Sequence, residues 1–290
     1  MTDRPPFDLG PSLLFCPGDR PERFAKAAER ADAVILDLED AVAASDKSAA
    51  RAHLAAHFGV DGPAGRDREL RHRTVVRVNA GDSGELAADL QMLVGTGVEF
   101  VMLAKTESAE DVAQVASVLG GVGVIALCET AAGVVAAEEI AAHPATVALM
   151  WGAEDLIASI GGSSSRLPDG TYRDVARQAR SRVLLAAAAY GAAGIDAIYA
   201  DIADVDGLAA ESADAVGSGF AAKACIHPSQ VTVIRSAYAP TEEELEHARA
   251  LLEEVSQHGG AFQFRGAMVD APLIRHAERV VQRAEATGAD

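Results

Sequence analysis

Residues 147–160 read VALMWGAEDLIASI, an apolar run followed at once by two acids, the second of which is Asp155. Residues 122–133 (VGVIALCETAAG) repeat the arrangement, with Glu129 as the acid that ends the run. Both patterns are typical of a buried strand that passes directly into a helix. Because the carboxyl ends of neighbouring parallel strands meet at one mouth, Glu129 and Asp155 are predicted to share one hard cation.

The same alternation of apolar, β-prone runs and amphipathic segments extends along most of the chain. The expected strands are residues 12–16, 33–38, 74–79, 100–105, 123–129, 146–151, 196–201 and 222–227. The segments with helical spacing include residues 20–30, 46–58, 83–94, 109–119, 173–190 and 205–217. Eight strands that alternate with helices predict an α/β fold, a parallel (β/α)8 TIM barrel. An open doubly wound sheet is the alternative, but no GxGxxG turn follows the first strand.

The chain continues beyond the eighth expected strand. Residues 241–257 (TEEELEHARALLEEVSQ) predict a helix that begins with a capping box formed by Thr241 and Glu244. Residues 258–260 (HGG) break this helix, and a last helix is predicted over residues 272–286.

These elements divide the chain into two parts. Residues 1–238 are predicted to form the TIM barrel catalytic domain, and residues 239–290 a C-terminal helical extension. The extension is too long to be a frayed end and too short to be an independent domain, so we expect it to act as a lid docked on its own barrel or on a neighbouring protomer. Residues 63–73, which are polar and rich in Gly and Arg, are predicted to form a surface loop.

The charge and composition exclude several classes of partner. Asp and Glu number 43 against 25 Lys and Arg, and the net charge of −18 opposes binding to nucleic acid and to anionic membrane surfaces. No apolar run reaches the roughly 20 residues needed to cross a bilayer, and no secretory signal is visible. The three cysteines are scattered singly through apolar runs, which is typical of reduced, structural thiols. We therefore expect a cytoplasmic protein.

Polar residues gather where the expected strands end, which is where TIM barrels carry their chemistry. They are Asp37, Glu39, Asp40, Arg77, Asn79, Lys105, Glu129, Glu154, Asp155, Asp201 and His227. Carboxylates without a His or Cys companion favour Mg²⁺ or Mn²⁺ over Zn²⁺, so Glu129 and Asp155 are predicted to be metal ligands. The alternative is that both are surface acids at helix N-termini, where the helix dipole favours them.

Two charged residues interrupt apolar strands close to this pair. Arg77 lies in VVRVNA, where its guanidinium group either binds a carboxylate or thioester oxygen of a substrate or forms an internal salt bridge with one of the site's own acids. Asp37 in VILDLEDA is expected to be functional. Lys105 either neutralises the charge of the site or bridges the site to a neighbouring acid. His227 either contacts a ligand or is a hydrogen-bonded histidine at the start of a helix.

Positive charge is concentrated in the first loop of this acidic chain. Arg20, Arg23 and Lys26 lie in the segment PGDRPERFAK, at a helix start whose N–H groups also attract anions. They predict contact with the phosphates of a ligand outside the mouth, and the alternative is a solvated helix face. Residues 161–172 (GGSSSRLPDGTY) are long for a connection, so we expect a flap beside the metal site in which Arg166 reaches the ligand.

Segments in order along nearly the whole chain resemble the HpcH/HpaI aldolase and citrate lyase β-subunit superfamily. They are LLFCPGDRPERFAKAAERADAVILDLEDAV, VVRVNA, VMLAKTESAEDV, ALCETAAGV, MWGAEDLIASIGGSSSR, KACIHPSQV and GAMVDAPLIRHAERV. The segment MWGAEDLIASIGGSSSR is similar to the stand-alone citrate-lyase-β-like (CitE-like) proteins, which are thought to act on free acyl-CoA. The resemblance implies a TIM barrel with a C-terminal helical extension, bound Mg²⁺ and a homotrimer or a dimer of trimers.

The resemblance also implies roles for individual residues. Glu129 and Asp155 match the metal-binding acids, and Glu129 also lies against the substrate. Arg77 matches the catalytic Arg that contacts the substrate, and Asp37 matches a catalytic strand-end acid near the metal. Asp270 matches a catalytic acid that relatives supply from a neighbouring protomer's extension. The residues that match the region near the CoA phosphates are Arg20 and Lys26.

Three positions depart from the family's pattern. Ala104 stands where relatives often have Pro in LPK, and Ala132 stands where they have Arg in ETARG. Ala267 replaces a basic residue that often precedes MVD. The metal pair is intact, and the acyl part of the substrate is left open.

The implied activity is that of a Mg²⁺-dependent carbon–carbon lyase acting on an acyl-CoA. Its substrate would be a 3-hydroxy-dicarboxylyl-CoA thioester of the citramalyl-, malyl- or β-methylmalyl-CoA type. Cleavage would give acetyl- or propionyl-CoA and a keto acid, through an enolate stabilised by the metal and Arg77, with Asp270 exchanging the proton at carbon. The alternatives are the β subunit of a carrier-protein-linked citrate lyase complex and a CoA-free class II aldolase of hydroxy-keto acids.

Overall fold

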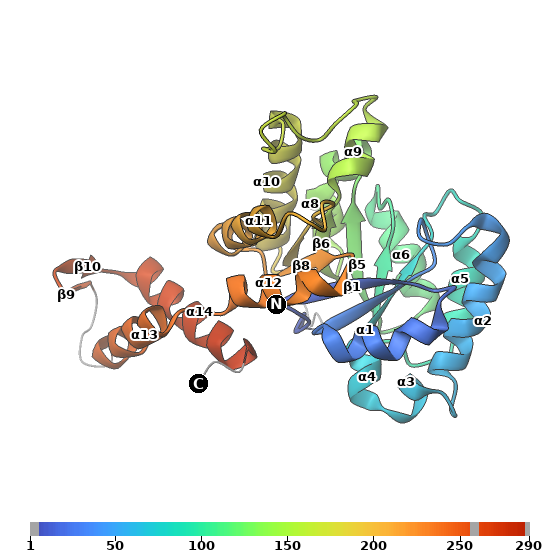
Figure 1. The fold of residues 1–290 in the computed structure, drawn as a ribbon, viewed down its shortest axis with the longest axis horizontal. Coiled ribbons are helices and arrows are strands. Elements are labelled where there is room, and N and C mark those ends of the chain that lie inside the picture. Colours follow the sequence, from blue (N-terminus) through green and yellow to red (C-terminus); the bar gives the residue numbers. More distant parts are fainter. Residues whose placement is uncertain (1–5, 256–260, 288–290) are drawn as a thin grey trace.

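The chain folds into a closed barrel of eight strands surrounded by helices (Figure 1). The computed structural model describes residues 6–255 and 261–287. The strands are β1 (Ser12–Pro17), β2 (Ala33–Asp37), β3 (Thr74–Val78), β4 (Phe100–Leu103), β5 (Gly123–Cys128), β6 (Thr146–Trp151), β7 (Ala193–Asp196) and β8 (Ala222–Cys225). Each strand pairs in parallel with the next along the chain, and β8 pairs with β1. The predicted TIM barrel is confirmed.

Helices connect the strands on the outside of the barrel. They are η1 (Pro21–Arg23), α1 (Phe24–Arg30), η2 (Ala44–Asp46), α2 (Lys47–Phe58), α3 (Pro63–Arg66), α4 (Arg68–His72), α5 (Leu86–Leu93), α6 (Ala109–Val118), α7 (Ala131–Val135), α8 (Ala137–Ala142), α9 (Ala153–Ser159), α10 (Asp174–Ala189), α11 (Val205–Ser218) and α12 (Pro228–Tyr238). Within the described ranges, no helix combines the length and the apolar character that a membrane crossing requires.

Side chains that alternate along the strands divide the apolar core into two layers. Leu13 and Ile35 belong to the inner layer, which fills the barrel. Leu14 and Leu36, their neighbours in the chain, belong to the outer layer between the strands and the helices. All four are at most 2% exposed. The interior is therefore packed, and the space for chemistry lies at the mouth.

Two predicted elements are wrong. The seventh strand is not residues 196–201, since β7 ends at Asp196, whose buried carboxylate pairs with Arg180 and Lys223 in the barrel wall. Residues 63–73 are not a loop but hold α3 and α4. The Asp67 carboxylate caps α4 by accepting hydrogen bonds from the first backbone N–H groups of that helix.

The C-terminal extension contains two helices and a hairpin. They are α13 (Glu242–Val255), β9 (Phe262–Phe264), β10 (Ala267–Val269) and α14 (Ala271–Thr287). The capping box at Thr241 is confirmed, because the Thr241 N–H donates to Glu244 Oε2 at 2.8 Å and the Glu244 N–H donates to Thr241 Oγ1 at 3.2 Å. The predicted break at residues 258–260 lies outside the described residues, and the hairpin has no counterpart among the predicted elements.

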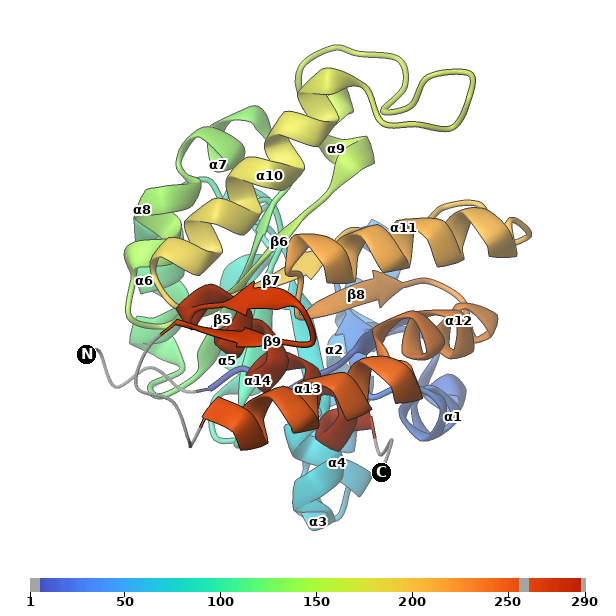
Figure 2. The ribbon, with the colours of Figure 1, turned by 90° about the vertical axis from the view of Figure 1, so that its left-hand side faces the viewer.

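The extension projects from one side of the barrel, with α14 nearest to it (Figures 1 and 2). Its buried side chains, among them Leu251, Val269 and Val280, form a small core of their own. Its helices thus pack mainly on each other, and the division near residue 238 stays a prediction.

His72, at the end of α4, makes stability depend on pH. Its Nδ1 lies 2.8 Å from Glu99 and its Nε2 lies 3.0 Å from Asp8. The hydrogen bond to Glu99 is the main cause that raises the pKa of His72 above its ordinary value. A raised folded-state pKa contributes stability that is complete below about pH 6.5 and is lost as the pH rises through the folded-state pKa. Because His72 is partly exposed, the contribution stays below about 1 kcal/mol.

We therefore expect wild type to exceed His72→Gln in unfolding free energy by more at pH 6 than at pH 8. Urea denaturation at both pH values measures this difference. An equal difference at the two values would contradict the charged pairing of His72.

Candidate active site

The mouth of the barrel brings together charged side chains from five successive strand ends. Asp37 ends β2 and pairs in register with Arg77 of β3. Lys105 follows β4, Glu129 follows β5, and Asp155 lies in the first turn of α9 after β6. Two further acids follow Asp37 in the chain. We call the whole set the mouth cluster, and its members are Asp37, Glu39, Asp40, Arg77, Lys105, Glu129 and Asp155.

Arg77 is held by a buried fork of hydrogen bonds. Its Nε donates to Asp37 Oδ1 at 2.7 Å and its Nη2 donates to Asp37 Oδ2 at 2.6 Å. Burial is the largest single influence and would lower the pKa of Arg77, but the charge and hydrogen bonds of Asp37, together with the charges of Glu39 and Glu129, outweigh burial and raise the pKa. Both Asp37 oxygens also accept backbone N–H groups, from Glu39 and Ala41. Asp37 thus orients Arg77, whose Nη1 faces Glu39 Oε2 at 3.0 Å.

Glu129 is a buried acid beside a second acid. Burial is the main cause that raises the pKa of its carboxyl group to about 8, and the charge of Asp155 adds to the effect. Asp155 is less enclosed, with 39% of its side chain exposed. A buried carboxylate next to another carboxylate is stabilised by any cation that reaches both. The pair is therefore suited to a cation.

Glu129 and Asp155 also face a common point. The Lys105 ammonium nitrogen lies 4.0 Å from Glu129 Oε1 and 3.7 Å from Asp155 Oδ1, so one positive group reaches both acids. Among the described residues, no group of three or more His, Cys, Asp or Glu is arranged to hold a metal ion. The protein ligands would then be this pair alone, with water or substrate oxygens completing the shell. An all-oxygen, incomplete protein shell fits Mg²⁺.

Gly152 leaves the space that the Glu129 carboxylate occupies. A Cβ atom at this position would lie 2.8 Å from Glu129 Cβ and 2.9 Å from Glu129 Oε2. The backbone of Gly152 is extended (φ −126°, ψ 123°), so alanine adds a steric contact without backbone strain. We expect Gly152→Ala to displace the carboxylate and to weaken Mg²⁺ affinity by about ten-fold or more, measured by calorimetry.

Gly81→Ala is the matched control for this substitution. Gly81 follows β3, and its added Cβ would meet only Asp111 Oδ1, at 3.7 Å. Affinity should match wild type in this control. Unchanged affinity in Gly152→Ala as well would contradict the role of Glu129 as a ligand.

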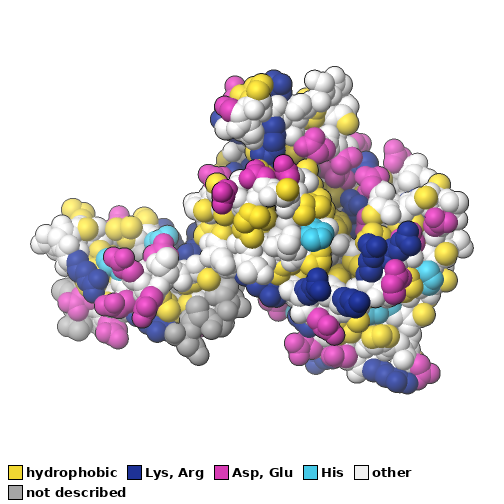
Figure 3. Space-filling model, in the orientation of Figure 1, with side chains coloured by type: hydrophobic (Ala, Val, Ile, Leu, Met, Phe, Trp, Pro, Cys, Tyr) yellow, Lys and Arg dark blue, Asp and Glu magenta, His cyan; other side chains and the backbone are white. Residues whose placement is uncertain are grey.

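The basic residues of the first loop lie on the surface. Arg20, Arg23 and Lys26 are exposed, and Arg20 and Arg23 have only distant ion pairs, at 3.8 Å with Asp19 and 3.9 Å with Glu22. Figure 3 shows Lys and Arg side chains gathered over the part of the barrel that α1 covers. These side chains are accessible to an anionic ligand.

The flap, residues 161–172, is tied to the barrel. Ser165 donates to Glu154 Oε1 at 2.6 Å. Arg166 donates to Glu211 Oε2 at 2.7 Å and stacks on the Tyr172 ring at 3.8 Å. Arg166 is thus engaged within the protein, in contrast to the expected ligand contact.

A buried polar network beside the mouth has no counterpart in the sequence predictions. Asp196 accepts hydrogen bonds from Trp151 Nε1 at 2.7 Å, from Arg180 Nε at 2.9 Å and from Lys223 Nζ at 3.0 Å. Lys223 is fully buried and also donates to Glu211 at 2.9 Å. The sequence held one signal of this network, a single charged residue in each of the two short strand segments GID and AKAC.

Asp201, His227 and Asp270 lie apart from the mouth cluster. Asp201 lies in the loop after β7, where its carboxylate accepts the Ala203 N–H at 3.0 Å. His227 is the N-cap of α12, which is the helix-start alternative. Asp270 lies between β10 and α14, in the extension, which Figure 1 shows projecting away from the barrel.

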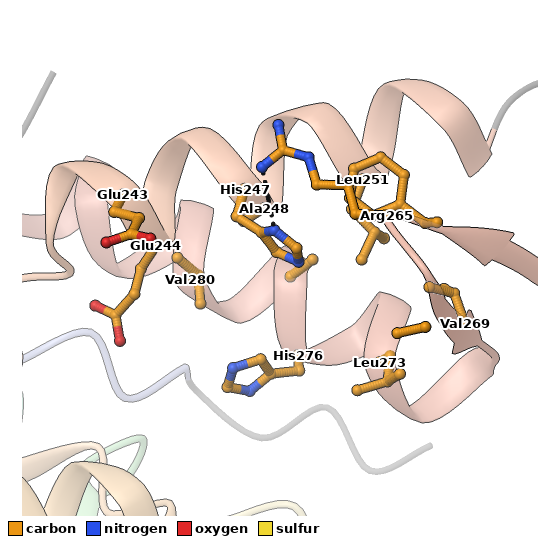
Figure 4. Close-up of a pocket in the computed structure, with 13 residues that line it drawn as sticks. Glu243, Glu244, His247, Ala248, Leu251, Arg265, Val269, Leu273, His276 and Val280 are labelled. Carbon is orange, nitrogen blue, oxygen red and sulfur yellow. Dashed lines mark hydrogen bonds between the residues drawn. The ribbon is translucent and has the colours of Figure 1, made fainter.

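A cavity of about 450 Å³ lies in the extension and not at the mouth. Its lining, drawn as sticks in Figure 4, comes from α13, the hairpin and α14, and includes Leu251, Val269 and Val280. His247 and Arg265 approach each other at its edge, at 3.5 Å. The lining is mostly apolar, so we assign the chemistry to the charged mouth cluster.

Comparison with known proteins finds two matching family models. One, described as HpcH/HpaI aldolase/citrate lyase, matches residues 11–228. The other, described as a C–C bond lyase of the TIM-barrel fold, matches residues 172–289.

Individual relatives match over nearly the whole chain. A citrate lyase subunit beta-like protein of Mycobacterium tuberculosis is 54% identical, covering 96% of this chain and 97% of that protein. A mitochondrial citramalyl-CoA lyase of Mus musculus is 30% identical, covering 93% and 84%. A crystal structure of CitE from Mycobacterium tuberculosis, in complex with magnesium, acetoacetate and coenzyme A, has a TM-score of 0.85 and 53% identity, covering 96% of this chain and 98% of that one.

Proposed function

The chain belongs to the HpcH/HpaI aldolase/citrate lyase family and is a lyase, and we propose that it cleaves a carbon–carbon bond in a 3-hydroxy-dicarboxylyl-CoA thioester with Mg²⁺. The observation that carries this proposal is the Glu129–Asp155 pair, which opens onto the same mouth as Arg77. The related structure with magnesium and coenzyme A supports the choice of ion and carrier. The citramalyl-CoA lyase among the relatives supports substrates of the citramalyl-, malyl- or β-methylmalyl-CoA type.

In the reaction, the substrate hydroxyl loses its proton and becomes the carbonyl of the keto acid. The electrons of the broken bond pass to the thioester fragment as an enolate, whose carbon then takes up a proton. When held by Glu129 and Asp155, Mg²⁺ would lower the pKa of the substrate hydroxyl.

Arg77 supplies a fixed positive charge to the same mouth. Its Nε and Nη2 are held by Asp37, so the guanidinium group does not reorient during the reaction. A charge that is already oriented stabilises a developing oxyanion without reorganisation. We assign Arg77 to the enolate oxygen and Asp37 to the orientation of Arg77.

The exposed first loop suits the phosphates of CoA. Arg20 and Lys26 lie outside the mouth and are accessible to solvent. On a chain with a net charge of −18, such a local group of cations is the means to hold a multiply charged anion. We assign Arg20 and Lys26 to the phosphate end of the substrate.

We further propose that Asp270 acts at the mouth of a neighbouring copy, in a homotrimer or dimer of trimers. In its own chain Asp270 lies in the projecting extension (Figure 1). The extension also exposes apolar side chains, with Met268 76% and Leu273 43% accessible, beside its apolar cavity. A carboxyl group brought in this way would exchange the proton at the enolate carbon.

The test is turnover of the purified chain with citramalyl-CoA and malyl-CoA, compared with free citramalate and malate, by detection of the released keto acid. We expect release from at least one thioester and none from the free acids. Release from the free acids would favour a CoA-free aldolase. Release only from a carrier-protein thioester would favour a citrate lyase subunit, which the name of the Mycobacterium tuberculosis relative keeps open.

A further inference from the structure

Lys105 lies at the centre of the mouth cluster. Its ammonium group bonds to Glu39 and donates to Asp40 at 3.2 Å. The same nitrogen is 3.7 Å from Asp155 and 4.0 Å from Glu129. One side chain therefore joins the acids after β2 to the metal pair after β5 and β6.

The backbone of Lys105 has a separate role. Lys105 is one of two described non-glycine residues with positive φ, at 47°. This left-handed conformation is strained for a residue with a Cβ atom. It directs the Lys105 N–H to Glu129 Oε1, at 3.1 Å. Glu129 is thus oriented by the Lys105 backbone, whereas the Lys105 side chain supplies charge.

Charge is unbalanced within the mouth cluster. Its five carboxylates face two permanent cations, a formal excess of three negative charges. Arg77 is fixed by its fork to Asp37 and is almost fully buried. Lys105 has 30% of its side chain exposed and a flexible four-carbon stem. Lys105 is thus the cation of the cluster that has room to move.

We propose that Lys105 is a positioning residue that competes with the divalent cation: its ammonium group, held by Glu39 and Asp40, lies close enough to Glu129 and Asp155 to oppose binding of the ion to that pair. This inference rests on the proposed function, because it requires a divalent ion at the pair. Lys105 then lowers metal affinity and holds the acids together when no metal is bound.

The competition has a predictable direction. A single positive charge a few ångströms from a divalent ion repels that ion. If the effective dielectric constant lies between that of the protein surface and that of water, this repulsion weakens Mg²⁺ affinity by about ten-fold or more. Removal of the ammonium group alone should therefore tighten metal binding. A lysine with a purely structural role would leave affinity unchanged or lower it.

The experiment is calorimetric titration of Mg²⁺ into the metal-free protein, without substrate. Lys105→Met keeps the length and the backbone requirement but removes the charge, and Lys105→Gly also relieves the positive φ. Both should bind Mg²⁺ about ten-fold more tightly than wild type. Lys105→Arg keeps the charge and should retain the wild-type affinity.

The matched control is Lys47→Met. Lys47 lies beside the same strand ends, but its Nζ donates to the Leu38 carbonyl at 2.8 Å and to Asn79 Oδ1 at 2.7 Å, and not to the metal pair. Its Mg²⁺ affinity should therefore stay close to wild type. An equal gain in Mg²⁺ affinity in Lys47→Met would show that loss of any nearby positive charge has this effect. That result would contradict a specific role for Lys105.

Thermal denaturation provides a second readout. Without metal, Lys105→Met should melt below wild type, because the acids repel each other, and saturating Mg²⁺ should raise its Tm by more than it raises that of wild type. Folded Lys105 variants with unchanged or weaker Mg²⁺ binding would overturn the inference. Wild type that binds no Mg²⁺ would instead overturn the proposed function, so the two failures are distinguishable.

Discussion

Glu129→Gln should lower kcat/KM for the thioester by at least about a hundred-fold and weaken Mg²⁺ binding in parallel. Glutamine keeps the shape of the side chain and the bond from the Lys105 N–H but removes the charge. Asp155, which is partly exposed, would then be the remaining carboxylate of the pair. Turnover over a range of Mg²⁺ concentrations, with calorimetry of the same protein, measures both effects.

Glu154→Gln is the control for this prediction. Glu154 precedes Asp155 in the first turn of α9, and its carboxylate accepts a hydrogen bond from Ser165 in the flap. The Lys105 ammonium group pairs with Glu39, Asp40, Glu129 and Asp155 rather than with Glu154, so loss of the Glu154 charge should leave Mg²⁺ affinity near the wild-type value. If Glu129→Gln and Glu154→Gln behaved alike, Glu129 would not be a metal ligand.

Arg77→Met should lower the free energy of unfolding by about 3–5 kcal/mol, because it leaves Asp37 buried without its counter-ion. Asp37 is fully buried, and Arg77 is 9% exposed. The double variant Asp37→Asn/Arg77→Met removes both charges and should recover part of this loss. Urea denaturation of wild type, the two single variants and the double variant gives the coupling energy.

Arg177→Met is the control for this prediction, because it breaks an exposed ion pair instead of a buried one. Arg177 pairs with Asp174 on α10, where the side chains are 60% and 93% exposed. Its loss should cost less than about 1 kcal/mol. A similarly small cost for Arg77→Met, or no recovery in the double variant, would contradict a buried and coupled Arg77–Asp37 pair.

Activity separates the two roles of Arg77. At a temperature where the variant is folded, Arg77→Lys keeps a charge but loses the fork to Asp37. If Arg77 acts on the enolate, kcat should fall while Mg²⁺ affinity changes little. An Arg77→Lys enzyme with wild-type kcat/KM would show that Arg77 stabilises the fold but does not act in catalysis.

The barrel could be predicted from the sequence because most of its strands are apolar runs that have turn or helix signals on both sides. The exception, β7, shows the limit of this approach. Residues 193–201 (AGIDAIYAD) are apolar with two acids, and a local pattern does not reveal which acid is buried. Asp196 is buried because Lys223, Arg180 and Trp151, remote in sequence, satisfy its carboxylate. Such tertiary partners are invisible to periodicity.

The residues of the mouth cluster could be predicted from the sequence, but the way in which they pair with one another could be predicted less well. Acids at strand ends point into a barrel mouth for geometric reasons, which placed Glu129 and Asp155 together. The two alternatives for Arg77 could not be separated from sequence, and the structure shows the internal pair with Asp37. The left-handed backbone of Lys105 has no sequence signal, because Lys is not a residue that favours positive φ.

In the proposed reaction, a divalent ion at the mouth cluster enables cleavage of a CoA thioester. Its most direct measurement is keto acid release from citramalyl-CoA or malyl-CoA by wild type stripped with EDTA, before and after Mg²⁺ is added back. We expect no release from the stripped protein and full recovery with Mg²⁺. Equal release with and without the ion would contradict this role of the ion.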